Sequence, residues 1–188
     1  MTVLHHRSAW LCAACCLALT APSAIAQSPF GPAPLPARPA DVASIDAIIV
    51  AAFEAMSGEA GVARDWDRFR SLFKPSAQFI TAPSAQGGAG FRLNPRSLEE
   101  IIQSMDGWLA ENTLYEGPVH TVTEQFGRIA HAFVTYEARR AADAAEPSGR
   151  GISSFQLMHD GARWWIVNWF WVGEREGDPI PKKYLPME

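Results

Sequence analysis

The sequence GISSFQLMHDGARWWIVNWFWV, residues 151–172, joins two apolar runs through a central Asp160-Gly161 pair. Runs rich in Ile, Val, Phe and Trp on both sides of an Asp-Gly turn predict a β-hairpin. The second run holds four of the seven tryptophans, Trp164, Trp165, Trp169 and Trp171. A strand presents alternate residues to opposite faces, and both faces of this strand are apolar. We therefore expect one face to line a core or cavity and the other to meet a helix or a second subunit.

Residues 1–26 have the composition of a secretory signal peptide. A basic flank at Arg7 precedes an apolar run at residues 9–21, and the small-residue site Ala24-Ile25-Ala26 follows. These three features together are typical of an export leader. The apolar run is shorter than the roughly 20 residues that span a bilayer. We expect cleavage before Gln27, a periplasmic or secreted mature protein, and no membrane contact after cleavage.

The composition of the mature chain limits its partners. The three cysteines, Cys12, Cys15 and Cys16, all lie in the leader, so we expect neither a disulfide nor a cysteine-based metal site. Arg7 is the only Lys, Arg, Asp or Glu residue in the leader, and its removal leaves 15 basic and 20 acidic side chains. No cluster of Lys and Arg suits a phosphate backbone, so nucleic acid is not an expected partner.

The first half of the mature chain is predicted to be helical. Residues 27–40 are rich in proline and predict an extended arm. Apolar residues at helical spacing then predict a first helix that ends near Gly58: Ile45, Ile48, Ile49, Ala52, Phe53 and Met56. A short second helix is predicted around residues 66–73. Ser97 and Glu100 form a capping box, which predicts the start of a third helix.

The second half is predicted to be a sheet. Residues 78–81 predict a brief first strand, and residues 83–93 predict a Gly-rich rim loop. Further strands are predicted at residues 120–126 and 129–140, and the Trp-rich hairpin follows a polar loop. Residues 174–188 predict an irregular tail. Three helices followed by an antiparallel meander predict one α+β domain over residues 41–173.

Three segments carry a family resemblance: WDRF at residues 66–69, FGRIA at residues 126–130 and, above all, HDGARWWIV at residues 159–167. They resemble the nuclear-transport-factor-2-like (NTF2-like) superfamily, which includes ketosteroid isomerase and the SnoaL-like cyclases. The resemblance implies a cone-shaped α+β fold, with three N-terminal helices packed on a strongly curved antiparallel sheet. Residues 150–152, 163–165 and 179–181 also look like an exported bacterial branch of unknown activity. Because the superfamily contains enzymes, binders and scaffolds, the fold alone does not give the function.

The same resemblance argues against steroid isomerase chemistry. The catalytic base of the isomerase precedes a proline on the first strand, and the matching residue here is Ala82 before Pro83. The protonated acid in the isomerase pocket corresponds to Ser154 by hairpin alignment. Neither carboxylic acid is present, so we do not expect this activity.

Strand register supplies the candidate pocket residues. A two-residue turn at Gly127-Arg128 pairs Glu124 with His131, Val122 with Phe133 and His120 with Thr135. In related cone folds, the positions equivalent to His131, Phe133, Thr135 and Glu137 point into the cavity. A four-residue loop at the second hairpin directs Ser154, Gln156, Trp165, Val167, Trp169 and Trp171 inward. A two-residue turn there would instead direct Trp164, Ile166 and Asn168 inward.

Glu124 and His131 are the candidate catalytic residues. A carboxylate beside an imidazole favours the imidazolium and orients it for acid/base work. The alternative is a cross-strand pair that only fixes the register. The remaining candidates are predicted to bind ligand: His120, Phe133, Thr135, Glu137, Ser154, Gln156, Trp165, Trp169 and Trp171. We predict no metal site, because His120 and Glu124 are about 13 Å apart along a strand.

Two functions remain open. The first is an exported domain that binds a small organic ligand in an aromatic-lined cone pocket without a cofactor. The second is a cofactor-free lyase or isomerase that uses His131 and Glu124. A purely structural, dimeric protein is a third possibility, and its cavity would be blocked by Trp side chains. A homodimer is expected because the last hairpin would leave Phe155, Trp164, Ile166 and Phe170 facing outward.

Overall fold

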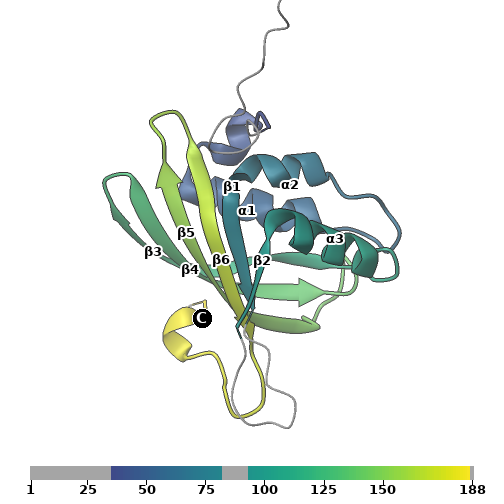
Figure 1. Cartoon of the computed structure of the whole chain (residues 1–188). Coiled ribbons are helices and arrows are strands. Elements are labelled where there is room, and N and C mark those ends of the chain that lie inside the picture. Colours follow the sequence, from purple (N-terminus) through teal and green to yellow (C-terminus); the bar gives the residue numbers. More distant parts are fainter. Residues whose placement is uncertain (1–34, 82–92, 187–188) are drawn as a thin grey trace, which may run out of the picture.

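A computed structural model describes residues 35–81 and 93–186 (Figure 1). The expected leader, the arm up to residue 34 and the rim loop up to residue 92 lie outside these ranges. The helices are η1 (Pro39–Val42), α1 (Ile45–Met56), α2 (Trp66–Leu72), α3 (Leu98–Leu109) and η2 (Lys182–Tyr184). The strands are β1 (Phe73–Thr81), β2 (Asn94–Ser97), β3 (Tyr115–Phe126), β4 (Ile129–Arg139), β5 (Gly149–His159) and β6 (Trp164–Gly173).

Side-chain caps fix where the three α-helices begin. Ser44 Oγ accepts a hydrogen bond from the Ala47 amide at the start of α1, and Asp65 caps α2 in the same way. The predicted capping box at α3 is confirmed, because Ser97 Oγ accepts from the Glu100 amide and the Glu100 carboxylate accepts from the Ser97 amide. Such caps satisfy amide groups that have no partner within the helix. None of the helices in the described ranges is both long and apolar enough to cross a membrane.

The six strands form one sheet in the order β2-β1-β6-β5-β4-β3. The α+β class is confirmed, but the expectation of a wholly antiparallel sheet is wrong, because β1 and β6 run parallel. Parallel neighbours need a long connection, and here α3 and strands β2 to β5 lie between them in the chain. The sheet is not strongly curled, so the expected cone stays a prediction.

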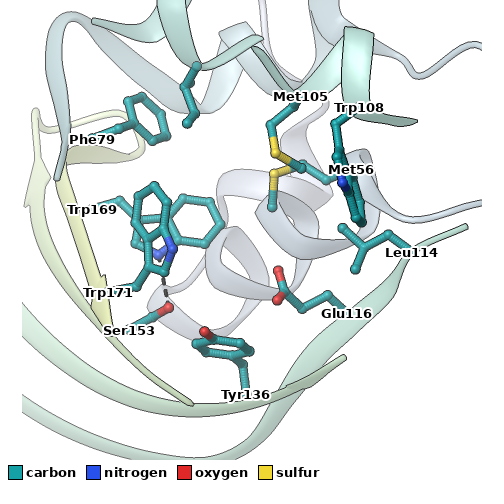
Figure 2. Close-up of a pocket in the computed structure, with 11 residues that line it drawn as sticks. Met56, Phe79, Met105, Trp108, Leu114, Glu116, Tyr136, Ser153, Trp169 and Trp171 are labelled. Atoms are coloured by element: carbon teal, nitrogen blue, oxygen red, sulfur yellow. Dashed lines mark hydrogen bonds between the residues drawn. The ribbon is translucent and has the colours of Figure 1, made fainter. Parts of the chain in front are cut away.

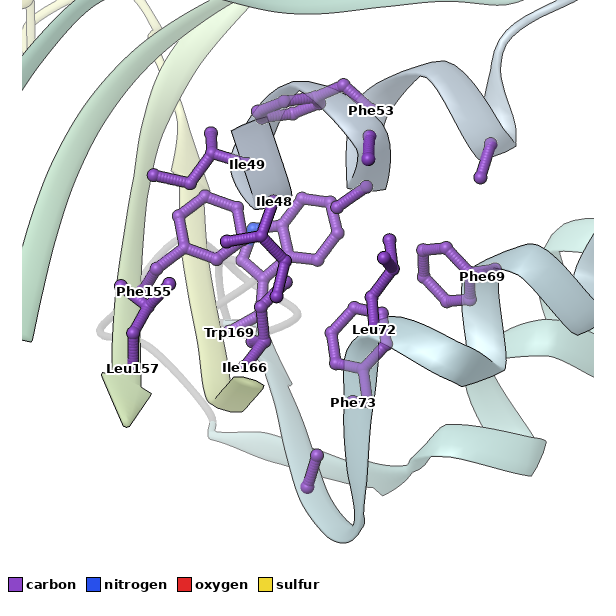
Figure 3. Close-up of a cluster of buried hydrophobic side chains, with 14 of the residues drawn as sticks. Ile48, Ile49, Phe53, Phe69, Leu72, Phe73, Phe155, Leu157, Ile166 and Trp169 are labelled. Carbon is purple, nitrogen blue, oxygen red and sulfur yellow. The ribbon is translucent and has the colours of Figure 1, made fainter. Parts of the chain in front are cut away.

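Helix α1 packs on one face of the sheet, which we call the inner face, and forms the main core (Figure 3). The Phe53 ring meets the Trp169 indole edge-on, with 5.2 Å between centroids, and Phe155 lies 4.7 Å from the same indole. Burying a large apolar side chain stabilises the fold by about 1.5–3 kcal/mol. Phe155, Trp164 and Ile166 are buried in this core. The expectation that these three face outward is therefore wrong.

A β-bulge divides β6 into two halves. Leu157 pairs with Ile166, whereas the adjacent Gln156 pairs with Asn168, so Val167 is an extra residue in β6. Before the bulge, Trp164 and Ile166 belong to the inner face, and after it Trp169 does. A regular strand would have turned these two halves to opposite faces. The four-residue hairpin loop is confirmed, since His159 pairs with Trp164.

Candidate functional site

A cavity of about 260 Å³ lies between α3 and the inner face of the sheet (Figure 2). Its walls come from α1, α3 and five of the strands, so no single sequence segment defines it. Most lining side chains are apolar or aromatic, and one carboxyl, one phenol and one aliphatic hydroxyl group lie among them. The lining residues are Met56, Phe79, Ile101, Met105, Trp108, Leu114, Glu116, Tyr136, Ser153, Trp169 and Trp171. Apolar walls with a few convergent polar groups are typical of small-molecule sites.

Two tryptophans of β6 form the main aromatic wall. The ring centroids of Trp169 and Trp171 are 5.8 Å apart. Trp169 Nε1 donates a hydrogen bond to Ser153 Oγ at 2.9 Å, and the Phe73 ring lies parallel to the Trp169 indole with 6.4 Å between centroids. Trp171 is half-buried, and its ring lines the cavity. Trp108 stands at the rim, with the Arg140 guanidinium 4.9 Å from its ring centroid.

Glu116 is the carboxylate of the cavity. Its backbone is held by the α1 C-cap, because the Glu116 amide donates to Ser57 Oγ at 3.0 Å and Ser57 Oγ donates to the Glu116 carbonyl. The side chain points into the cavity (Figure 2). Burial raises the pKa of Glu116 to about 7, because the charged form loses hydration. The carboxyl group can therefore gain or lose a proton near neutral pH.

Tyr136 faces Glu116 from the neighbouring strand β4. Burial and the negative charge of Glu116 raise the pKa of Tyr136, so its hydroxyl stays protonated and can donate a hydrogen bond. The ring crosses the backbone of Gly151, its partner on β5. A Cβ atom at Gly151 would come within 2.5 Å of the Tyr136 hydroxyl oxygen and 2.4 Å of the Val172 carbonyl oxygen. The absence of a side chain at Gly151 therefore leaves room for the phenol.

A second bulge, at Val119 in β3, gives Glu116 its position. Pro118 pairs with Tyr136, but His120 pairs with the adjacent Thr135. Paired residues of an antiparallel ladder share a face. Glu116 and Pro118 therefore lie on the inner face, whereas His120 lies on the opposite, outer face. Beyond this bulge the predicted register is confirmed, including the pairing of Glu124 with His131.

Most of the predicted pocket residues lie on the outer face, so the expectation that they face the cavity is corrected. Ala130, Ala132, Val134 and Tyr136 are the buried residues of β4 on the inner face, and Thr135 is buried on the outer face. Helix α1 and the core cover these side chains on the inner face. Because side chains alternate along a strand, the residues of β4 between them point to the outer face. The outward set comprises His131, Phe133, Thr135, Glu137, Ser154, Gln156 and, with them, His120.

Several side chains of the outer face contact one another or the 3-10 helix η2. His131 Nε2 lies 2.9 Å from Ser154 Oγ, and the Glu137 carboxylate accepts from Arg139 Nη2 at 2.6 Å. The 3-10 helix η2 covers part of this face, where Thr135 Oγ1 donates to the Tyr184 carbonyl. The rings of Phe133 and Tyr184 are 4.9 Å apart.

The predicted tryptophans divide between the faces. Trp169 and Trp171 line the cavity, whereas Trp165 belongs to the outer face. Trp165 Nε1 donates to Asp160 Oδ2 at 2.6 Å, and Lys74 and Arg163 both stack on its ring. Val167 is the bulge residue and does not line the cavity.

Glu124 and His131 line a separate, shallow depression of about 270 Å³ on the outer face. Phe126, Ile129 and Gln156 complete its rim. Glu124 and His131 are paired residues of β3 and β4, and neither lines the main cavity. Its catalytic role stays a prediction.

Sequence reasoning missed Glu116, Tyr136 and Ser153. Tyr136 belongs to the alternating set of β4 that includes Ala130, Ala132 and Val134, and these small apolar residues indicated which face of β4 is covered. Glu116 was harder to find because β3 begins at Tyr115, five residues before the predicted strand, and the bulge at Val119 breaks the alternation.

Solved structures share this fold. No protein-family model and no curated relative matches the chain. An uncharacterised protein with a cystatin-like fold from Caulobacter vibrioides matches with a TM-score of 0.52 at 16% identity, over 71% of this chain and 89% of its own. A cystatin-like protein of unknown function from Nostoc punctiforme matches at 0.50 with 10% identity, over 67% and 85%.

The neighbours also include an NTF2-like protein of unknown function from Silicibacter pomeroyi, with a TM-score of 0.48 and 18% identity over 70% of this chain and 94% of its own. The two cystatin-like matches show a likeness of fold, and membership of the NTF2-like superfamily stays an expectation. At such low identities the likeness extends to the arrangement of helices and strands and no further.

Proposed function

We propose that this protein is an exported domain that binds a small organic ligand in the aromatic-lined cavity between α3 and the sheet, as in the interior of a cone. One observation carries the proposal. The cavity has apolar walls of Trp169, Trp171 and neighbouring side chains, and the polar groups of Glu116 and Tyr136 converge on it. The tryptophans line the space without filling it, which favours a ligand over a purely structural role.

The proposal is tested by binding to the mature chain. Mass spectrometry of protein purified under native conditions should detect a co-purifying small molecule. Trp171→Leu removes an aromatic wall and should release that molecule or weaken its binding. Trp66→Leu is the matched control, because Trp66 lies on α2 outside the cavity, with Nε1 bonded to Asp106 Oδ1. A molecule retained equally by both variants would show that the cavity is not its site.

A cofactor-free lyase or isomerase is the second candidate, and the pKa of Glu116 favours it. A general acid or base works best when its pKa is close to the operating pH, and burial raises the pKa of Glu116 to about 7. Tyr136 could donate a hydrogen bond to the oxygen on which charge develops. In this second candidate function, Glu116 acts as a general acid or base in the cavity, in addition to the predicted pair Glu124 and His131 on the outer face. Turnover of the co-purifying molecule by wild type, lost in Glu116→Gln, would support it.

A homodimer through the outer face belongs to the same proposal. The tip of the β3–β4 hairpin exposes Val122, Phe126 and Ile129, all on that face, and Phe126 is 85% exposed. Helix η2 covers the face only around Phe133 and Thr135. An exposed apolar patch of this kind is typical of a protein interface. A second copy of the chain would cover it by two-fold contact.

A further inference from the structure

Glu116 forms no ion pair among the described residues, although it points into a largely apolar cavity. Asp41, Glu99 and Glu174 each form an ion pair with an arginine. In the part of the chain that the structure describes, no side chain donates a hydrogen bond or forms an ion pair with the Glu116 carboxylate. The described lining residues also include no Lys or Arg. A partly buried carboxylate without a counter-charge is stabilised when a cation enters the cavity with it.

The surroundings of Glu116 are suited to a positive charge. Trp169 and Trp171 present indole rings to the cavity, and Tyr136 adds a third aromatic ring. The face of an aromatic ring attracts cations, Trp most strongly, and the attraction grows when the cation is shielded from water. Among the described cations, Arg140 is exposed and rests on Trp108 at the rim, and the Arg64 guanidinium donates to backbone carbonyls, including that of Met56.

The size of the cavity limits the ligand. Its volume of about 260 Å³ is slightly below the usual range of about 300–1,000 Å³ for ligand pockets. The methionines Met56 and Met105 lie opposite the carboxylate and provide apolar, polarisable contact. The site therefore suits a compact ligand with one charged group and an alkyl periphery.

We propose that the cavity binds a small organic cation, a quaternary ammonium or protonated amine. Glu116 balances its charge, and Trp169 and Trp171 contact its alkyl groups. This inference rests on the proposed ligand-binding function and names the chemical class of the ligand. The alternative is that the ligand is neutral and is held only by apolar contacts and the Tyr136 hydroxyl.

Two probes of the same shape separate these alternatives. Choline carries a quaternary nitrogen, and 3,3-dimethylbutan-1-ol has a carbon atom in its place. Titration calorimetry on the full chain at pH 8 should give choline an affinity at least about tenfold higher, because only choline gains from the carboxylate and the indoles. Glu116→Gln should reduce this preference, because only the contribution of the indoles remains. Glu111→Gln, which removes an exposed charge at the end of α3, should keep it.

A pH series on the wild-type chain provides a test that does not depend on a variant folding. Tyr136 and Glu116 are the titratable groups facing the cavity among the described lining residues. Protonation of Glu116 removes its charge, so choline affinity should fall about tenfold between pH 8 and pH 6. Affinity for the neutral isostere should not change. A pH-independent choline affinity would overturn the inference.

The remaining outcomes distinguish this inference from the function on which it rests. Equal affinities of the two probes, or binding of neutral benzyl alcohol but not of choline, would overturn the cation inference and leave the ligand-binding function intact. If neither choline, its isostere nor benzyl alcohol binds, and no molecule co-purifies with the protein, both proposals fail.

Discussion

Trp169 and Ser153 are joined by a hydrogen bond between two buried groups, the indole Nε1 and the hydroxyl Oγ, at 2.9 Å. The bond ties β6 to β5 below the cavity and fixes the plane of the deeper indole. The rest of the Trp169 ring is surrounded by Phe53, Phe73 and Phe155. Aromatic packing holds the ring in place, and the hydrogen bond sets its orientation.

Loss of this hydrogen bond should destabilise the fold. Ser153→Ala leaves a buried indole N–H without its acceptor, which costs about 1–3 kcal/mol. Urea unfolding followed by circular dichroism measures the change. Ser148→Ala is the control, because its exposed hydroxyl can be replaced by water, and it should cost less than about 0.5 kcal/mol. Equal stability of the two variants would contradict a structural role for the bond.

Gly151 should be intolerant of a side chain. Gly151→Ala places a Cβ atom against the Val172 carbonyl and the Tyr136 hydroxyl, so the phenol or the strands must move. Overpacking of this kind costs about 1–3 kcal/mol. Gly149→Ala provides the comparison two residues away, where a Cβ atom has no neighbour within 4 Å. Thermal unfolding of both variants checks this, and a Gly151→Ala protein as stable as Gly149→Ala would refute the crowding.

Stability should depend on pH through Glu116. Burial raises its pKa from 4.5 to about 7, so the native state holds more protons than the unfolded state within this window. The contribution of Glu116 to the free energy of unfolding should therefore be highest below pH 4.5 and should decrease as the pH rises to about 7. The loss should be about 1–2 kcal/mol, allowing for the partial exposure of the side chain.

Glu116→Gln should abolish this fall, because the amide is neutral throughout, and should make the protein relatively more stable at pH 8. Glu111→Gln serves as the reference, since its side chain is exposed. Urea unfolding at pH 5, 6, 7 and 8 compares the three proteins. If the wild type and Glu116→Gln show parallel pH profiles, the carboxylate is not buried in solution.

The outer-face interface should depend on the hairpin tip. Phe126→Ser/Ile129→Ser removes two exposed apolar side chains of β3 and β4 and should weaken a dimer by about tenfold or more without unfolding the monomer. Val62→Ser/Leu93→Ser removes comparably exposed side chains elsewhere and should leave the association unchanged. Sedimentation at several micromolar concentrations tests this. A wild-type chain that is monomeric at all of these concentrations would contradict the proposed homodimer.

Export can be tested on the natural protein. The leader at residues 1–26 predicts a mature chain that begins at Gln27. N-terminal sequencing of protein from a periplasmic extract should find this residue. Protein that keeps Met1 and remains with the cytoplasmic fraction would contradict the prediction.

Local patterns in the sequence predicted the elements well, and bulges limited the prediction of the site. Helical spacing located α1, and the Ser97–Glu100 pair located the start of α3. Strand pairing from the Gly127-Arg128 turn gave the correct partners for His131 and Phe133. Which face meets the helices depends on tertiary packing, and neither the turn nor the register determines it. The four residues of β2, three of them exposed, carry no apolar alternation, and this strand was not predicted.

The bulge at Val167 has a consequence for how β6 can change in length. Since Ile166 and Trp169 already occupy the inner face on either side of it, deletion of Val167 would leave ordinary alternation with every inward indole in place. The neighbouring β5 has no such spare residue, and a deletion at its centre would invert one half of that strand. The central strand that carries the tryptophans could therefore lose a residue and keep its cavity wall.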